Sequence, residues 1–279
     1  MVRHRIPVTL EEALEHLNET TYKIIAGGTD LMVQNRAWSE LPPKFDAPLL
    51  FCFNLEALKY VKEENAFIKI GSMTDLETLL HHPLTPEILR KVIYEMASPA
   101  IRKVSTLSGN IGNASPAADS LLALYALDAK VEIKSQKETR LSTVSELILG
   151  PRKTALKQNE IITEIIIPKS SFTQTCFVKV GGRRADAISK VAFVGCASVE
   201  NNVIKDIRMT INAVAARLIR RQDIEKGLCE KTPDEVKQNV NAILEAYSTS
   251  IQPIDDQRSN KDYRKYTANN LIKAFLNTL

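Results

Sequence analysis

The sequence of 279 residues lacks the features that mark membrane, secreted and nucleic-acid-binding proteins. No stretch approaches the roughly 18 consecutive apolar residues that a membrane-spanning helix needs, and charges interrupt the first residues where a secretory leader would be apolar. A single tryptophan and eight phenylalanines provide no row of interleaved aromatics, and the net charge of +4 is not gathered in a basic tract. We therefore expect a cytoplasmic protein with neither a membrane nor a nucleic-acid partner.

Paired metal ligands are also missing. The four cysteines are Cys52, Cys176, Cys196 and Cys229, and the four histidines are His4, His16, His81 and His82. No two cysteines form a CxxC pair, and the histidines show no ligand spacing. We expect reduced, mostly buried thiols and no metal site.

Two familiar nucleotide-binding fingerprints are absent as well. The chain contains neither GxGxxG nor GxxxxGK[ST], and it has no internal repeat. What it does contain is an ordinary globular composition, with 44% apolar and 25% charged residues. Its length allows one large domain or two to three small ones.

The first half of the chain alternates between helical and strand patterns. A capping box at Thr9-x-x-Glu12 precedes apolar residues at helical spacing, which predicts a helix from residue 10 to 17. The predicted strands are 22–26, 48–55 and 67–71, with a new helical start at about Asp30 between the first two. A second capping box, Thr74-x-x-Glu77, predicts the next helix. Thr85-Pro86-Glu87 predicts another, with Pro86 in its first turn.

The second half contains long β-branched runs followed by helical patterns. Residues 130–134 alternate as a half-exposed strand does, and 161–167 form a β-branched run that ends at Pro168. Further predicted strands are 175–180, 190–199 and 203–214, and predicted helices are 233–247 and 261–277. A domain boundary falls near 168–173.

Two stretches carry the chemistry. In 22-YKIIAGGTDLMV-33 an apolar run ends on Gly27-Gly28, which is either a plain tight turn or a backbone cradle for phosphate. About 80 residues later, 105–116 holds mostly small or amide side chains and reads as a loop that lets a ligand approach the backbone. The two could face each other around one anionic ligand, where several amides together form an anion-binding nest.

Four motifs in order resemble one family. They are AGGTDL (Ala26–Leu31), TLSGNIGNASPAAD (Thr106–Asp119), GPRKTALKQNEIITEIIIP (Gly150–Pro168) and KVGGRRADAISKVA (Lys179–Ala192). Together they resemble the FAD-binding medium subunit of the molybdenum hydroxylases, which include xanthine dehydrogenase and carbon monoxide dehydrogenase. The similarity runs over nearly the whole chain.

This resemblance implies an α+β fold. The expected architecture is a vanillyl-alcohol-oxidase/PCMH-type FAD-binding domain of two α/β lobes at 1–170, with lobes of about 1–56 and 57–170. A C-terminal domain with a small antiparallel sheet and helices follows at 171–279.

The resemblance also assigns cofactor-binding positions. Those for the pyrophosphate are Ile24, Ile25, Ala26, Gly27, Gly28, Thr29, Asp30, Leu31, Thr106, Leu107, Ser108, Gly109 and Asn110, and Asn113 is a further cofactor-binding position. Ser115, Asp119 and Ile162 match adenosine-side positions, Ile101 lines the cofactor and Lys179 lies near the flavin ring. Ser108 departs from the family's usual glycine, and would cost roughly 1 kcal/mol if that position needs a positive φ. Arg183 and Arg184 could guide an NAD phosphate or a partner, or form a surface ion pair with Asp186 nearby.

The implied function is that of an FAD-dependent oxidoreductase subunit. Electrons would pass from iron–sulfur centres through FAD to NAD or another acceptor, with iron–sulfur clusters on a small partner subunit and molybdopterin on a large one. A xanthine-dehydrogenase-like reaction on a purine is the favoured substrate class. Two alternatives stay open from sequence: a flavin-free assembly or maturation factor, and a stand-alone flavin oxidase of the same fold.

Overall fold

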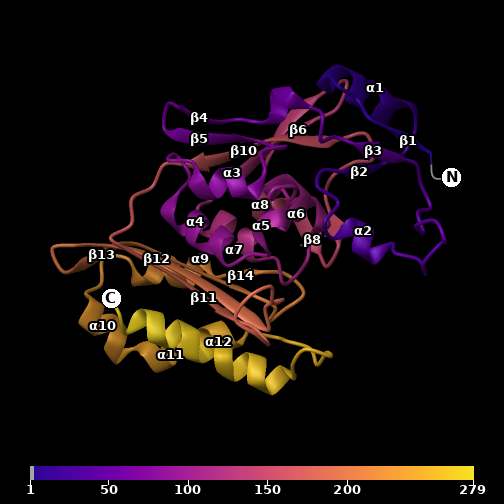
Figure 1. Cartoon of the computed structure of the whole chain (residues 1–279). Helices are drawn as coiled ribbons and strands as arrows, with labels where there is room; N and C mark the ends of the chain where they lie inside the picture. The colour runs from indigo at the N-terminus through magenta and orange to yellow at the C-terminus, as the bar shows by residue number, and fades with distance from the viewer. Residues whose placement is uncertain (1–2) are drawn as a thin grey trace. The chain divides into compact units, whose positions relative to one another are not determined.

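The computed structural model describes residues 3–279, and the chain forms two compact units (Figure 1). Unit 1 comprises Met1–Thr85, Ala97–Ala114 and Asp128–Pro168, and unit 2 comprises Pro86–Met96, Ser115–Leu127 and Lys169–Leu279. Two short segments from the first half of the chain therefore belong to the same unit as the C-terminal hundred or so residues.

The elements of unit 1 are mostly short. They are β1 (His4–Arg5), α1 (Leu10–Glu19), β2 (Lys23–Ile25), α2 (Leu31–Gln34), β3 (Leu49–Phe51), the 3₁₀ helix η1 (Glu56–Leu58), β4 (Val61–Glu64), β5 (Phe67–Gly71), α3 (Leu76–His81), α5 (Pro99–Arg102), α6 (Leu107–Asn113), β6 (Lys130–Lys134), β7 (Thr139–Thr143), α8 (Val144–Leu147), β8 (Ile148–Gly150), β9 (Lys153–Thr154) and β10 (Ile161–Pro168).

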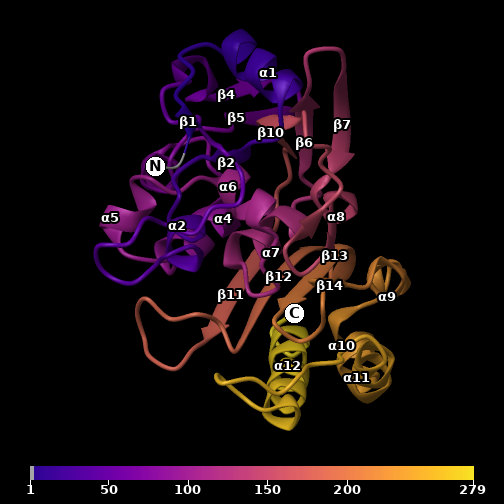
Figure 2. The same ribbon diagram turned by 90° about the vertical axis from the view of Figure 1, so that its right-hand side faces the viewer.

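Unit 1 contains two larger sheets of different kinds. The order β1-β3-β2 is a small parallel sheet (Figure 1), and β4-β5-β10-β6-β7 is antiparallel (Figure 2). A two-stranded hairpin of β8 and β9 completes the set. The central position of β10 in the larger sheet explains its β-branched, apolar sequence, because a strand with neighbours on both edges is the one most enclosed by the sheet.

Helix α1 forms as its sequence predicts. The Thr9 side chain accepts a hydrogen bond from the Glu12 amide, and the Glu12 carboxylate reaches back to the amide of Val8, one residue before the cap. The buried side chains of Ala13 and Leu17 pack with Leu50, Cys52 and other apolar residues from the β3 region. Burial raises the pKa of the Cys52 thiol to about 12, so this cysteine is a packing residue and not a nucleophile.

Two predicted helix starts are wrong by one residue. Asp75, not Thr74, caps α3: its carboxylate accepts from the amide of Thr78, while the Thr74 hydroxyl bonds the backbone of Tyr60. Pro86 occupies the cap position before α4, with φ −53° and ψ 140°, so it precedes the first turn instead of lying in it.

Unit 2 is a sheet covered on both faces. Its elements are α4 (Glu87–Tyr94), α7 (Asp119–Ala126), β11 (Gln174–Val180), β12 (Val191–Glu200), β13 (Val203–Asn212), β14 (Ile219–Arg220), α9 (Gln222–Leu228), α10 (Pro233–Gln238), α11 (Val240–Ser248) and α12 (Lys261–Leu276). The antiparallel order is β11-β12-β13-β14. Helices α4 and α7 contact one face, and α12 lies along the other (Figure 1).

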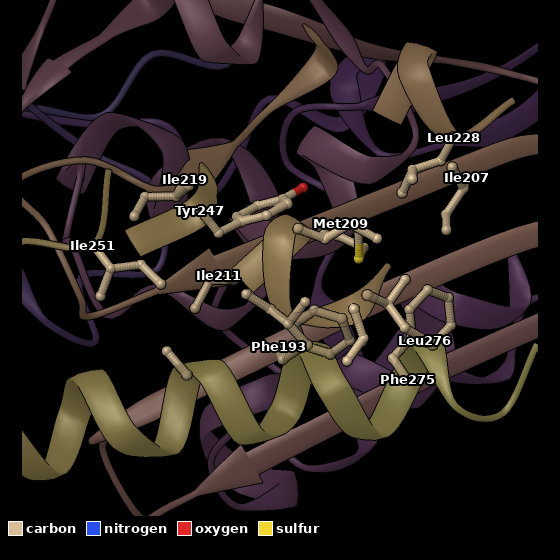
Figure 3. Close-up of a cluster of buried hydrophobic side chains, with 14 of the residues drawn as sticks. Phe193, Ile207, Met209, Ile211, Ile219, Leu228, Tyr247, Ile251, Phe275 and Leu276 are labelled. Carbon is tan, nitrogen blue, oxygen red and sulfur yellow. The ribbon is translucent and has the colours of Figure 1, made fainter. Parts of the chain in front are cut away.

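The main core of unit 2 lies between the sheet and the C-terminal helices. The rings of Phe193 on β12 and Phe275 on α12 pack at a tilt, with an interplanar angle of 56° and centroids 5.6 Å apart, in the same cluster as the buried Tyr247 of α11 (Figure 3). On the opposite face, every residue of α7 is buried, which explains why its sequence, 119-DSLLALYA-126, shows almost no polar side.

The predicted strands of unit 2 form, and its helices are more numerous than predicted. The single helix expected at 233–247 is two helices separated at Asn239, whose side chain donates to the carbonyl of Glu235 and ends the first of them. Helix α9 and strand β14 were not predicted, because each is too short to show a periodic pattern.

We expect Gly195→Ala to destabilise the protein. A Cβ at Gly195 would lie 2.6–2.8 Å from three ring atoms of Phe275. One of them is Cγ, where the ring joins the rest of the side chain, so the whole ring would have to move. Overpacking of this kind costs about 1–3 kcal/mol. The loss is measured as the difference in free energy of unfolding between the wild type and Gly195→Ala in urea.

Gly227→Ala in α9 is the matched control. A Cβ there meets nothing within 4 Å, so alanine should leave stability unchanged or raise it by about 0.5–1 kcal/mol. Equal stability of the two variants would contradict the close packing of Phe275 on β12.

Candidate cofactor site

The two glycines at the end of β2 meet different physical demands. A Cβ on Gly27 would lie 1.8 Å from the carbonyl oxygen of Val104, so no other residue fits where the two backbones pass. Gly28 has φ +68°, a left-handed conformation, and a Cβ there would meet only side chains, at 3.2–3.3 Å. Gly27 therefore permits the contact between segments, and Gly28 permits the turn.

The second small-residue stretch is largely a helix, and the prediction of a loop at 105–116 was wrong. Thr106 caps α6, and its hydroxyl accepts from the Gly109 amide at 3.0 Å. The helix ends at Asn113, and the cap residue that follows, Ala114, has φ +46°. A strong cap and a buried apolar side, formed by Leu107 and Ile111, outweigh the poor helix propensity of glycine, serine and asparagine.

The two stretches pack directly on each other within unit 1, as the sequence predicts. A Cβ on Gly109 would lie 3.5 Å from the Ala26 side chain. The Asn113 amide nitrogen donates to the Asp30 carboxylate at 2.6 Å, and Gln34 donates to the Asn113 amide oxygen at 3.2 Å. These contacts join the turn after β2 to the full length of α6.

Several hydrogen-bonding groups at this junction have no partner within the described chain. The backbone amides of Gly27, Gly28 and Thr29 donate to no acceptor among residues 3–279. The side-chain oxygens of Ser105 and Asn110 are buried and likewise have no hydrogen-bond partner there. Buried polar groups are rarely left unpaired, so this set fits a ligand that both accepts from amides and donates to oxygens. A dinucleotide with a pyrophosphate and hydroxyl-bearing sugars meets both demands.

Ser108 introduces no backbone strain. It lies inside α6 and is not among the residues with a positive φ, so the expected penalty of a serine at this position does not arise. Its hydroxyl donates to the carbonyl of Ser72 at 2.6 Å and lies 3.0 Å from the Thr106 hydroxyl. Serine in place of glycine at position 108 therefore adds a hydrogen bond between the start of α6 and the connection from β5 to α3.

Lys179 and Asp119 form a buried ion pair in unit 2. The Lys179 ammonium lies 2.8 Å from the Asp119 carboxylate and donates to the carbonyl of Glu95, and both side chains are 7% exposed. The other carboxylate oxygen accepts from Ser189 at 2.6 Å and from Asn212 at 3.0 Å. The pairing was not visible in sequence, where Lys179 reads as a lone strand lysine.

The Asp119 carboxylate thus binds residues at both ends of the loop that contains Arg183 and Arg184. Lys179 precedes this loop and Ser189 follows it, and both bond Asp119. Arg183 folds back to donate to the carbonyls of Ala185 and Asp186. No ion pair joins Arg183 or Arg184 to Asp186 among residues 3–279, so the predicted surface ion pair is absent from that part of the chain.

The remaining predicted positions differ in exposure. Ile101 is 42% exposed at α5, whereas Ile162 is buried in β10. Ser115 accepts from the amides of Ala117 and Ala118, in unit 2. Ser105 lines the junction and was predicted only as a member of the small-residue stretch 105–116, whereas Val104 lines it and was not predicted. Val104 contributes only a carbonyl, for which no sequence signal exists.

Comparison with known proteins identifies the family. Residues 1–170 match the family described as the FAD binding domain in molybdopterin dehydrogenase, and residues 177–279 match the CO dehydrogenase flavoprotein C-terminal domain. The chain belongs to the FAD-binding medium subunits of the molybdenum hydroxylases. The family predicted from the four motifs is confirmed, and with it the α+β fold and FAD as the cofactor.

Similar medium subunits come from several bacteria. The chain is 32% identical over 196 residues to the nicotinate dehydrogenase FAD-subunit of Eubacterium barkeri, a match that covers 66% of this chain and 64% of that one. It is 26% identical to the xanthine dehydrogenase FAD-binding subunit of Escherichia coli O157:H7, with 96% and 92% covered. A crystal structure of Cu,Mo-CO dehydrogenase shares the fold, with TM-score 0.88, 20% identity and 98% and 95% of the chains covered.

Membrane-spanning helices and metal-binding clusters are two other features relevant to this medium subunit. Among residues 3–279 no helix has the length and apolar character to cross a membrane. No group of three or more histidine, cysteine, aspartate or glutamate side chains in that range could hold a metal ion.

We expect Gly28→Val to release the cofactor from a folded protein. Valine at φ +68° costs about 1–2 kcal/mol and would redirect the amides of the turn. The flavin-to-protein ratio from visible absorbance should fall at least tenfold, while the far-ultraviolet circular dichroism stays the same.

Gly150→Ala is the control for this substitution. A Cβ at Gly150 meets nothing within 4 Å, so flavin content should not change. An undiminished flavin ratio in folded Gly28→Val would show that the glycine pair serves only as a turn.

Proposed function

We propose that this medium subunit holds one FAD non-covalently and relays electrons within a molybdenum hydroxylase. The observation that carries the proposal is the junction of the β2 turn with α6, where amides and buried side-chain oxygens lack partners inside a domain of the FAD-binding family. Bound FAD supplies redox chemistry that no side chain of this subunit can supply.

The residues of unit 1 would hold the cofactor by hydrogen bonds from the backbone. The amides of Gly27, Gly28 and Thr29 would donate to a pyrophosphate, whose negative charge such a nest favours. Ser105 and Asn110 would accept or donate to sugar hydroxyls. The other positions proposed to contact the cofactor are Ile24, Ile25, Ala26, Asp30, Leu31, Thr106, Leu107, Ser108, Gly109 and Asn113, with Ile101 lining it and Ile162 on the adenine side.

The residues of unit 2 have a different proposed contribution. Lys179 is charge-paired with Asp119, so its ammonium would act on a flavin ring through a fixed dipole and not as a free cation. Asp119 and Ser115 stay proposed adenosine-side positions. The proposed domain division remains 1–170, with lobes of about 1–56 and 57–170, and 171–279.

The proposed partners follow from the family to which the chain belongs. Electrons would come from an iron–sulfur small subunit and a molybdopterin large subunit in the cytoplasm. NAD is the proposed acceptor. The similar proteins are named for xanthine, nicotinate and carbon monoxide, and among these a purine such as xanthine is our proposed substrate.

Titration of flavin-free protein with FAD tests cofactor binding. We expect saturation at one FAD per chain, with resolved visible bands and quenched flavin fluorescence. A folded protein that shows no flavin bands after purification or after FAD addition would support the flavin-free assembly factor instead.

Purification from the native cell tests the assembly. We expect a hetero-oligomer that contains flavin, iron, sulfide and molybdenum and that hydroxylates its substrate, whereas the separate medium subunit should show at most weak NADH diaphorase activity. Full substrate turnover by the chain alone, without iron or molybdenum, would refute the electron-relay role and favour a stand-alone flavin oxidase.

A further inference from the structure

Arg102 is a buried cation next to the junction and is not one of the positions that the family motifs assign. It is the last residue of α5 and only 7% exposed. Its Nε donates to the Glu77 carboxylate at 2.7 Å, and its Nη1 donates to the carbonyl of Ala97 at 3.1 Å. The hydrogen bond from Arg102, assisted by His81, holds the pKa of Glu77 below its ordinary value.

The guanidinium connects two elements at a point where the backbone turns. Glu77 belongs to α3, and Ala97 has φ +48° just before α5 begins. Ser98 then caps α5, since its hydroxyl accepts from the amide of Ile101. Arg102 therefore fixes the start of α5 and anchors its end to α3.

The segment directly after Arg102 forms one wall of the junction. Ser105 donates from its amide to the carbonyl of Ile101 at 2.9 Å, and its own carbonyl accepts from the amide of Leu76 on α3 at 2.9 Å. The carbonyl of Val104 faces Gly27 so closely that no Cβ fits. A shift of α5 relative to α3 would consequently move Val104 and Ser105 against the β2 turn.

We propose that Arg102 and Glu77 form a positioning pair for the FAD site, which sets the place of Val104–Thr106 against Gly27 without contact to the cofactor. Arg102 is buried and Glu77 partly buried, so desolvation offsets much of the attraction between them, but the fixed geometry of such a pair can specify one arrangement. The role suits arginine in particular, since its planar fork holds the donors to the carboxylate and to the carbonyl in fixed directions, whereas a lysine ammonium is a compact charge on a flexible stem. This inference rests on the proposed function.

The test compares FAD binding by full-length Arg102→Lys, Arg102→Met and Glu77→Gln with Lys103→Met. Lys103 is the exposed neighbour of Arg102, so its variant removes the same charge without touching the pair. We expect the FAD dissociation constant to rise about tenfold in Arg102→Met, which corresponds to about 1.4 kcal/mol, and less in Arg102→Lys and Glu77→Gln. Lys103→Met should match the wild type.

Two measurements separate positioning from simple destabilisation. The visible circular dichroism of bound FAD should change in Arg102→Met at saturating cofactor, because the site would be reshaped. In flavin-free protein, hydrogen exchange at the amide of Leu76 should accelerate, since its bond to Ser105 depends on the same segment. Should Arg102→Met not fold, the two milder variants carry the test.

The outcomes distinguish this inference from the proposed function. A wild type that binds FAD, together with variants of equal affinity and an unchanged flavin spectrum, would overturn the positioning role and leave the function intact. A wild type that binds no FAD would overturn both. Weaker binding in Lys103→Met equal to that in Arg102→Met would mean that charge alone matters, and it too would overturn the positioning role.

Discussion

The close approach of two backbones at Gly27 is the constraint on which the candidate site depends. Because position 27 has no side chain, the carbonyl of Val104 can lie where a Cβ would be. That contact sets the start of α6, and α6 in turn places Gly109 against Ala26 and Asn113 against Asp30. The unpartnered amides of the β2 turn then face a surface whose position is already determined. A preorganised set of donors binds an anion better than a flexible one, since little entropy is lost on binding.

Much of the fold follows from local pattern. Strand β10 could be predicted because eight consecutive residues in the centre of a sheet are β-branched or otherwise apolar with few exceptions, and β6 because apolar and polar residues alternate there. The predictions that were wrong concern features that depend on tertiary contacts. The Thr74 hydroxyl could cap a helix, but it bonds the backbone of Tyr60, so the neighbouring Asp75 takes the cap. Likewise α6 is helical against its propensities because its apolar side is buried.

The candidate site, like the fold, could be predicted where it depends on local sequence pattern and could not where it depends on tertiary contacts. Glycines and small polar residues are visible in sequence, so the two stretches and their facing arrangement could be predicted. The carbonyl of Val104 leaves no sequence signature, and the buried pair of Lys179 and Asp119 joins residues far apart in the chain. A titratable residue read alone gives no indication of whether its charge is free or neutralised, which is why the role of Lys179 looks different once its partner is known.

The burial of α7 on all sides has a consequence for how the chain is made. This apolar helix emerges from the ribosome well before the strands that cover it: the hydrogen bond from the Thr210 hydroxyl to the carbonyl of Leu122 spans 88 residues. At common rates of synthesis the delay is roughly 4–18 s, during which α4 is the one helix of its own unit already available to contact α7. The nascent chain therefore exposes an apolar, aggregation-prone segment during synthesis. Protection by a chaperone at that stage would improve the yield of folded subunit.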